Sequence, residues 1–113
     1  MGDFSEINGH RRLGLAARDV ATGHLSPWGS EFEPGIDSFT GKRRALRNLS
    51  FSSIAVYVSG GGDGNRYPAS APAGRLWGFD AGSGAQLLER TAFVTAIAAT
   101  STRVYVGGYR EPV

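Results

Sequence analysis

One short pattern occurs twice in this chain and limits the folds that it can adopt. In each copy an apolar run ends in Asp, and a hydroxyl residue and Gly follow three and four positions later. An Asp carboxylate accepts hydrogen bonds from backbone N–H groups two or three residues on, a hydroxyl does so more weakly, and Gly takes the positive φ that closes a hairpin. Each copy therefore predicts a tight turn between two antiparallel strands. The turn residues are Asp19, Thr22 and Gly23 in the first copy, and Asp80, Ser83 and Gly84 in the second.

A second recurrence has its own fixed spacing. Residues 54–60 (Ile-Ala-Val-Tyr-Val-Ser-Gly) return at 102–108 as Thr-Arg-Val-Tyr-Val-Gly-Gly, so that Tyr57 recurs as Tyr105. The same displacement, called here the tyrosine shift, places Leu46 on Val94 without a gap. Regular self-similarity of this length is typical of repeat folds such as β-propellers.

The displacement from Asp19 to Asp80, called here the aspartate shift, is thirteen residues longer than the tyrosine shift. One connection must therefore be longer than its counterpart by this amount. Fifteen residues, 29–43, follow Trp28, whereas two follow Glu89 before the next predicted unit. We therefore expect residues 29–43 to be an inserted loop that is exposed and mobile.

Together the recurrences define a unit of four short strands, and short strands with Gly-rich turns are typical of antiparallel hairpins. Within a single domain, 1–113, the second half of one unit occupies 1–28, the complete unit 44–91, and the first half of the next 92–113. In the complete unit we expect strands at 45–51, 54–59, 75–80 and 85–89. Their copies are expected at 93–100 and 103–108, and at 13–19 and 24–28.

The strands at 54–59 and 75–80 are apolar on both faces, so the predicted sheets are covered on both sides. Such sheets at this spacing favour an all-β partial β-propeller of about two blades, each of four short antiparallel strands. A small β-sandwich is the alternative, but it does not explain the gap-free match. The predicted blade core consists of Val56, Tyr57, Val58, Trp77, Phe79, Val104, Tyr105 and Val106.

Residues 4–28 resemble the delta-60-type bacterial β-propeller repeats, whose pattern is Gly-Gly-x-Phe, Asn-Gly-x-x-Arg, Leu-Ala-x-x-Asp-x-x-Thr-Gly and then Trp. The chain has Asn8-Gly9, Leu15-Ala16 and Trp28 at the corresponding places, and 104–109 looks like the opening of another copy. Residues 76–84 are also similar to pyrroloquinoline-quinone-like propeller repeats, with Ser83 where Thr is usual. The resemblance implies a propeller, and an extracellular or cell-surface location in a larger protein.

Composition restricts the partners. The net charge of +2 is too small to indicate nucleic acid, no apolar run is long enough for a membrane span, and the absence of Cys excludes thiolate metal sites. Residues 1–6 have neither the basic nor the apolar region of a signal peptide, so we expect none in this chain.

Several polar groups are candidates for catalytic, cofactor or metal sites, and none has the required pattern. The Gly-rich segment 60–65 lacks the ligand series of a calcium loop and the Lys of a phosphate loop. The two histidines lack a third ligand, the acidic residues of the 29–43 loop are typical of solvated loops, and the basic cluster lacks an aromatic ladder. These candidates are His10 and His24; Glu31, Glu33 and Asp37; and Lys42, Arg43, Arg44 and Arg47.

The sequence therefore predicts a non-catalytic binding or scaffold module without a cofactor, part of a larger and exported bacterial protein. Its expected partners are further propeller repeats of a parent chain or other copies of itself, and its ligand is not defined. The alternative, carried by the second resemblance, is a fragment of a quinoprotein-like dehydrogenase propeller.

Overall fold

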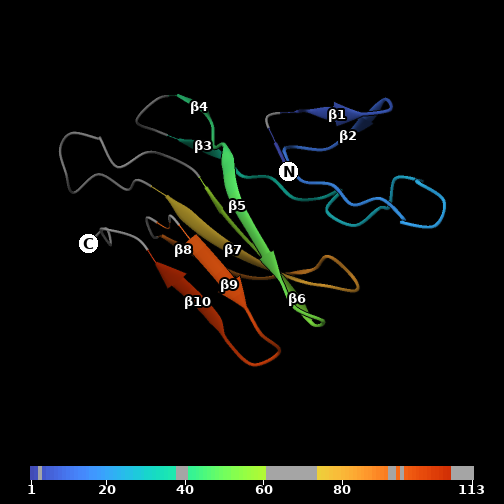
Figure 1. The fold of residues 1–113 in the computed structure, drawn as a ribbon. Helices are drawn as coiled ribbons and strands as arrows, with labels where there is room; N and C mark the ends of the chain where they lie inside the picture. The colour runs from blue at the N-terminus through green and yellow to red at the C-terminus, as the bar shows by residue number, and fades with distance from the viewer. Residues whose placement is uncertain (3, 38–40, 61–73, 92–93, 95, 108–113) are drawn as a thin grey trace.

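The computed structural model describes residues 1–2, 4–37, 41–60, 74–91, 94 and 96–107. These residues form antiparallel sheets without any helix, so the predicted all-β class is confirmed (Figure 1). Within the same residues, no helix is long and apolar enough to cross a membrane. The predicted Gly-rich segment 60–65 lies outside the described residues except for Gly60.

The centre of the molecule is a four-stranded antiparallel sheet in which each strand pairs with the next along the chain. Its strand order is β5-β6-β7-β8, and the strands coincide closely with those predicted for the complete unit. Runs rich in Val, Tyr, Trp and Phe favour extended backbone, and the connections between strands supply the turn residues. The strands are β5 (Leu46–Phe51), β6 (Ala55–Gly60), β7 (Arg75–Asp80) and β8 (Gln86–Thr91).

Three two-stranded hairpins accompany this sheet. The hairpin of β9 and β10 was predicted from the tyrosine shift, and the other two were not. Asn8 and Gly9 both have positive φ between β1 and β2, and an Asn-Gly pair is a strong hairpin signal in any sequence. The strands are β1 (Glu6–Ile7), β2 (His10–Arg11), β3 (Ile36–Asp37), β4 (Lys42–Arg43), β9 (Ala96–Ala99) and β10 (Val104–Gly107).

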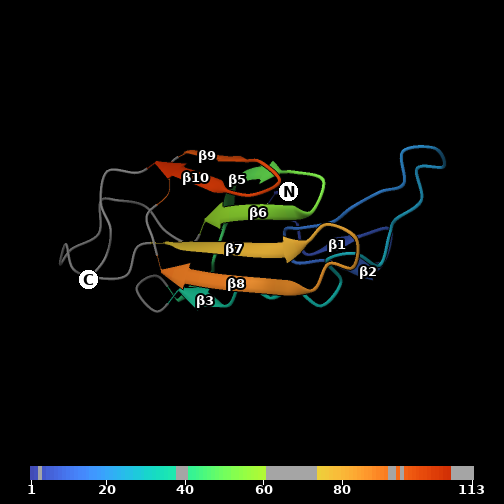
Figure 2. The ribbon, with the colours of Figure 1, turned by 90° about the horizontal axis from the view of Figure 1, so that it is seen from below.

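The central sheet lies between the N-terminal segments on one side and the β9–β10 hairpin on the other (Figures 1 and 2). Strand pairing places Val58 opposite Trp77 and Val56 opposite Phe79, so these four side chains share one face, called here the Trp77 face. Tyr57 pairs with a glycine of β7 on the opposite face, called here the Tyr57 face. β9 lies against β5 and β6.

The hydrophobic core is on the Trp77 face. Leu15, Trp28 and Phe32 from the N-terminal segments pack against Trp77 and Phe79. The ring of Phe32 meets Trp77 and Phe79 edge-on with centroids 5.2 and 5.1 Å away, and Trp28 meets Phe79 in the same way at 5.8 Å. Edge-to-face packing of this kind adds to the free energy gained by burying the rings.

Two of the predicted strands are absent. Residues 13–19 and 24–28 contain only one isolated bridge, between Arg18 and Leu25. The local signals predicted the turn correctly, but a two-stranded pair is only marginally stable without a third strand, and this segment has none among the described residues.

The expectation that the 29–43 loop is exposed is wrong in part. Phe32 has only 6% of its surface exposed, Pro34 and Asp37 are also buried, and the segment includes the β3–β4 hairpin. Phe32 is buried because the Trp77 face offers two large rings that would otherwise meet water. The length of the connection therefore reflects a packing role.

The predicted blade core is also wrong in part. Val58, Trp77 and Phe79 are fully buried and Val56, Tyr57 and Val104 half-buried, but Tyr105 and Val106 have 54% and 51% of their surface exposed. Tyr57 lies in the middle of a four-stranded sheet, whereas its counterpart Tyr105 lies on a hairpin strand with one edge unpaired in the described part of the chain. The same Val-Tyr-Val run is therefore buried to different extents in the two copies.

Candidate functional site

The two Asp turns have the same hydrogen bonds. The Asp80 carboxylate accepts from the N–H groups of residues 82 and 83 at 3.0 and 2.8 Å, and the Asp19 carboxylate accepts from those of residues 21 and 22 at 2.9 and 3.0 Å. Gly84 and Gly23, with φ of 78° and 74°, each donate an N–H to the Asp carbonyl of their own turn. The aspartate shift therefore relates two turns that agree bond for bond in their backbone.

The Asp80 carboxylate accepts three hydrogen bonds within its own turn. The Ser83 N–H, the Ser83 hydroxyl and the Gly82 N–H favour its charged form and lower the pKa of Asp80 below the usual value. The turn is therefore held most firmly while Asp80 is ionised.

The hairpins β5–β6 and β9–β10 also share their geometry. Phe51 pairs with Val56 and, at the tyrosine shift, Ala99 pairs with Val104. The next pair on the same face also agrees, since residue 49 pairs with 58 and residue 97 with 106. In both turns a hydroxyl at the equivalent position accepts two backbone N–H groups. The sequence match therefore extends to the register of the strands.

Residues 15–19, called here the first turn segment, have backbone groups without a backbone partner in the described part of the chain at Ala16 and Arg18. Ala17 and Asp19 direct backbone groups to residues 24–26, through bonds of 2.8 Å from Ser26 N–H to Ala17 O and from Asp19 N–H to the carbonyl of residue 24. Alternate residues of an extended segment point their backbone groups to opposite edges. Those of Ala16 and Arg18 thus face away from 24–26, and within the described residues they have no backbone partner.

An open, mostly apolar groove of about 380 Å³ lies along this edge. One wall is the turn segment, and the other belongs to the Trp77 face of the central sheet. The apolar lining includes two side chains of β5 that are exposed to water. The groove is lined by Leu15, Ala16, Ala17, Arg18, Asp19, Ser26 and Trp28 on one side, and by Leu49, Phe51, Val56, Ala81 and Gly82 on the other.

Strand β10 also has one edge without a partner in the described part of the chain. It pairs with β9 and with no other described strand, whereas its counterpart β6 pairs on both edges. Tyr105 and Val106, on this strand, are two of the exposed large apolar side chains. The groove and the β10 edge are therefore two surfaces that the described part of the chain leaves open.

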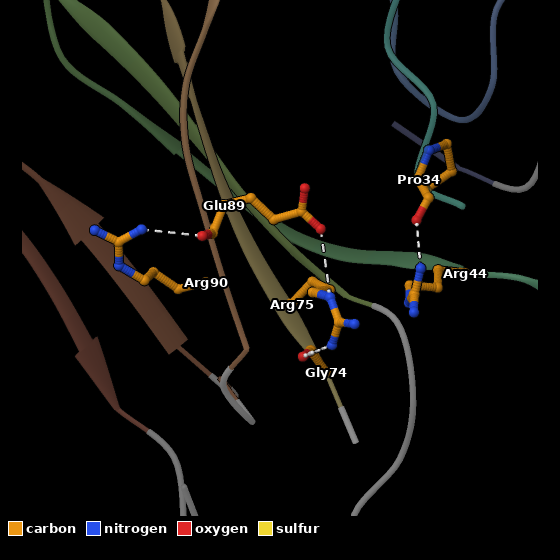
Figure 3. A network of polar contacts seen from close by, with 6 residues as sticks. All are labelled: Pro34, Arg44, Gly74, Arg75, Glu89 and Arg90. Carbon is orange, nitrogen blue, oxygen red and sulfur yellow. Dashed lines mark hydrogen bonds and ion pairs between the residues drawn. The ribbon is translucent and has the colours of Figure 1, made fainter. Parts of the chain in front are cut away.

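The basic residues are held by neighbouring carbonyl and carboxylate groups. Arg75 lies 3.4 Å from the Glu89 carboxylate, and Arg44 donates to the Pro34 carbonyl at 3.0 Å (Figure 3). Arg43 donates to a backbone carbonyl at 3.0 Å, which ties β4 to the N-terminal segment. These contacts give Arg43 and Arg44 of the basic cluster a structural role at one end of the sheet.

The other predicted candidates are dispersed. His10 lies on β2 and His24 follows the first turn. Glu33 is paired with Arg11 at 2.9 Å on the surface, and Asp37 is buried on β3. Among the described residues, no three His, Cys, Asp or Glu side chains gather in a way that could hold a metal ion. The remaining candidates are exposed; they are Glu31, Lys42 and Arg47.

Comparisons with protein-family models, with curated proteins and with solved structures found no match for this chain. Sequence reasoning did not locate the groove or its lining. It did predict other copies of the chain as partners, because residues 1–28 and 92–113 each match only half of a four-stranded sheet. Each half then has one edge without its usual partner.

Proposed function

We propose that the chain is a non-catalytic β-propeller repeat module that serves as a binding or scaffold part of a larger, exported protein. The observation that carries this proposal is the way in which the two half-units cover the central sheet. Leu15, which corresponds to Leu76 at the aspartate shift, packs on the Trp77 face. The β9–β10 hairpin lies on the other side, against β5 and β6.

This packing uses opposite faces of the same unit. Leu76 belongs to the Tyr57 face of the central sheet, and so its counterpart Leu15 packs a Tyr57-type face on a Trp77 face. In the hairpin, Ile97 and Val104 are half-buried while Tyr105 is exposed, so the side that corresponds to the Trp77 face is the more buried one. Successive sheets stacked face to opposite face are the arrangement of propeller blades.

A fusion of three copies of the chain tests this proposal. Six residues after Gly107 and the thirteen before Gly14 would link the two halves of each composite sheet, compared with fourteen between Gly60 and Arg75 in the complete one. We expect a compact particle that unfolds in one transition at a higher Tm than the single chain. If the chain is a small β-sandwich, the fusion should instead contain three independently folded units, with the Tm of the single chain and an extended scattering profile.

A matched control is the same fusion with Gly78→Val in every copy. A Cβ at Gly78 would lie 3.0 Å from the Tyr57 ring and 3.1 Å from Leu88, so this variant disrupts the sheet itself. It should lower the Tm of the fusion and of the single chain alike, which separates defects of folding from defects of blade assembly. No observation on the described residues favours the quinoprotein alternative, and it is not proposed.

A further inference from the structure

We infer that the groove beside residues 15–19 is the docking site for the β9–β10 hairpin of a second copy of this chain. The inference rests on the proposed repeat architecture and goes beyond it, because it names the occupant and its register. β10 of one copy adds to the free edge at residues 16–18 of the next, and the two halves complete one four-stranded sheet between two molecules.

The register follows from the central sheet. There, residue 56 pairs with 79, residue 57 with 78, and residue 58 with 77. Moving β6 forward by the tyrosine shift and β7 back by the aspartate shift gives the intermolecular pairs. They are Val104 with Arg18, Tyr105 with Ala17, and Val106 with Ala16.

The backbone groups agree with this register. In the central sheet the Ala81 N–H bonds to Ile54 O, which places the odd-numbered residues of β7 toward β6. Their counterparts in the first segment are Ala16 and Arg18, whose backbone groups have no backbone partner in the described part of the chain. The groups that the pairing needs are therefore the ones that the monomer leaves unused.

The side chains fit after one adjustment. In the central sheet the Tyr57 ring lies over Gly78, where a Cβ would come within 3.0 Å of it, so the Tyr105 ring must shift to pass the Cβ of Ala17 at the equivalent position. The side of the hairpin that carries Tyr105 would cover two exposed groove residues of β5, at positions 49 and 51, which are 41% and 68% exposed.

Charge supports the same register. Ala55 pairs with Asp80 in the central sheet, and the two shifts convert this pair into Arg103 with Asp19. Opposite charges therefore meet at the end of the intermolecular strand pair, where they are favourable.

Docking does not disturb the core. Leu15 stays on the Trp77 face of its own chain, because docking uses only the unpartnered backbone groups of Ala16 and Arg18. The contact joins two different surfaces, so it is head-to-tail and leaves one groove and one β10 edge for further copies. Rings form where the rotation closes, and open polymers form otherwise.

Disulfide trapping between separate chains tests the inference. The chain has no cysteine, so a bond between introduced residues identifies the contact. Tyr105 and Ala17 would form a non-hydrogen-bonded pair, the kind in which Cβ atoms lie closest across antiparallel strands. A chain with Ala17→Cys is mixed with a longer, tagged chain with Tyr105→Cys under mild oxidation. We expect the mixed disulfide in at least about tenfold excess over the control pair Ala16→Cys with Tyr105→Cys, whose side chains would face opposite sides.

Charge substitutions supply a second measurement that needs no cysteine. Arg103→Glu would place two negative charges together at Asp19 and should weaken association by roughly fivefold in light scattering, whereas Arg103→Lys should leave it nearly unchanged. Equal trapping in both cysteine pairs would overturn the inference. So would dominant bonds between two Tyr105→Cys chains, which would mean that β10 edges pair with each other.

A three-copy fusion that forms one cooperative particle, while separate chains neither associate nor cross-link, would keep the scaffold proposal and reject self-docking. Separate chains that cross-link in register while the fusion behaves as three independently folded units would reject the proposed architecture instead.

Discussion

The two Asp turns of this molecule have the same backbone hydrogen bonds and lie in different surroundings. The turn at Asp80 joins β7 to β8 within a four-stranded sheet, whereas the turn at Asp19 is flanked only by the isolated Arg18–Leu25 bridge. Asp, a hydroxyl and Gly are sufficient to form the turn because its bonds lie within a few residues. A sheet also depends on pairing with a strand outside the hairpin. Among the described residues, the strand before the Asp80 turn has such a partner in β6, and residues 15–19 before the Asp19 turn have none.

The largest expected effect contrasts the two Val residues that occupy equivalent places in β6 and β10. Val58 is fully buried and Val106 is 51% exposed. Val58→Asp should cost on the order of 4 kcal/mol in the free energy of unfolding, because it leaves an unpaired charge in the core, while Val106→Asp in the dilute single chain should cost less than about 0.5 kcal/mol. Urea denaturation of the two variants measures both values, and similar losses would mean that the hairpin is as well covered as the sheet.

The next effect separates the turns themselves. Gly84 and Gly23 both have positive φ, but a Cβ at Gly84 would lie 3.1 Å from Gly29 N and from the Trp28 ring, whereas nothing lies within 4 Å of one at Gly23. We expect Gly23→Ala to cost about 1 kcal/mol from backbone strain alone, and Gly84→Ala about 2 kcal/mol because Trp28 must also move. Thermal unfolding compares them, and a larger loss at Gly23 would contradict the packing described around Trp28.

These contrasts also separate what the sequence could predict from what it could not. The turns, the four strands of the central sheet and the register of β9–β10 follow from local residue types and two fixed shifts. The burial of Phe32 does not, because it depends on the uncovered rings of Trp77 and Phe79, which lie more than forty residues away in the sequence. The exposure of Tyr105 could not be predicted either, since its sequence context matches that of Tyr57.

A smaller effect is the loss of folding stability at low pH. Because the folded-state pKa of Asp80 is lowered by the Ser83 and Gly82 hydrogen bonds, its contribution to stability is complete above the unfolded-state pKa and is lost as pH falls through the folded value. Asp80→Asn keeps an acceptor oxygen without the charge, so the stability of this variant should fall less steeply in acid. Unfolding free energies measured across the acid range check the difference in slope. Identical slopes would mean that the charge of Asp80 does not stabilise the turn.

The smallest effect compares the two hydroxyls. The Ser83 hydroxyl donates to the Asp80 carboxylate at 3.0 Å and accepts from the Ala85 N–H at 3.2 Å. The Thr22 hydroxyl makes the second of these two bonds, accepting from the His24 N–H. Ser83→Ala should therefore cost about 1 kcal/mol and Thr22→Ala about 0.5 kcal/mol. Chemical denaturation resolves this pair, and the reverse order would show that the two turns differ in more than their flanking strands.

The most direct measurement follows the amide hydrogens of Ala16 and Arg18 by hydrogen exchange. In the dilute single chain they have no backbone partner among the described residues and should exchange rapidly. In the three-copy fusion, where β10 of one copy reaches residues 16–18 of the next, both should become strongly protected. Equal exchange rates in the two molecules would contradict the claim that the first turn segment awaits a strand from a neighbouring unit.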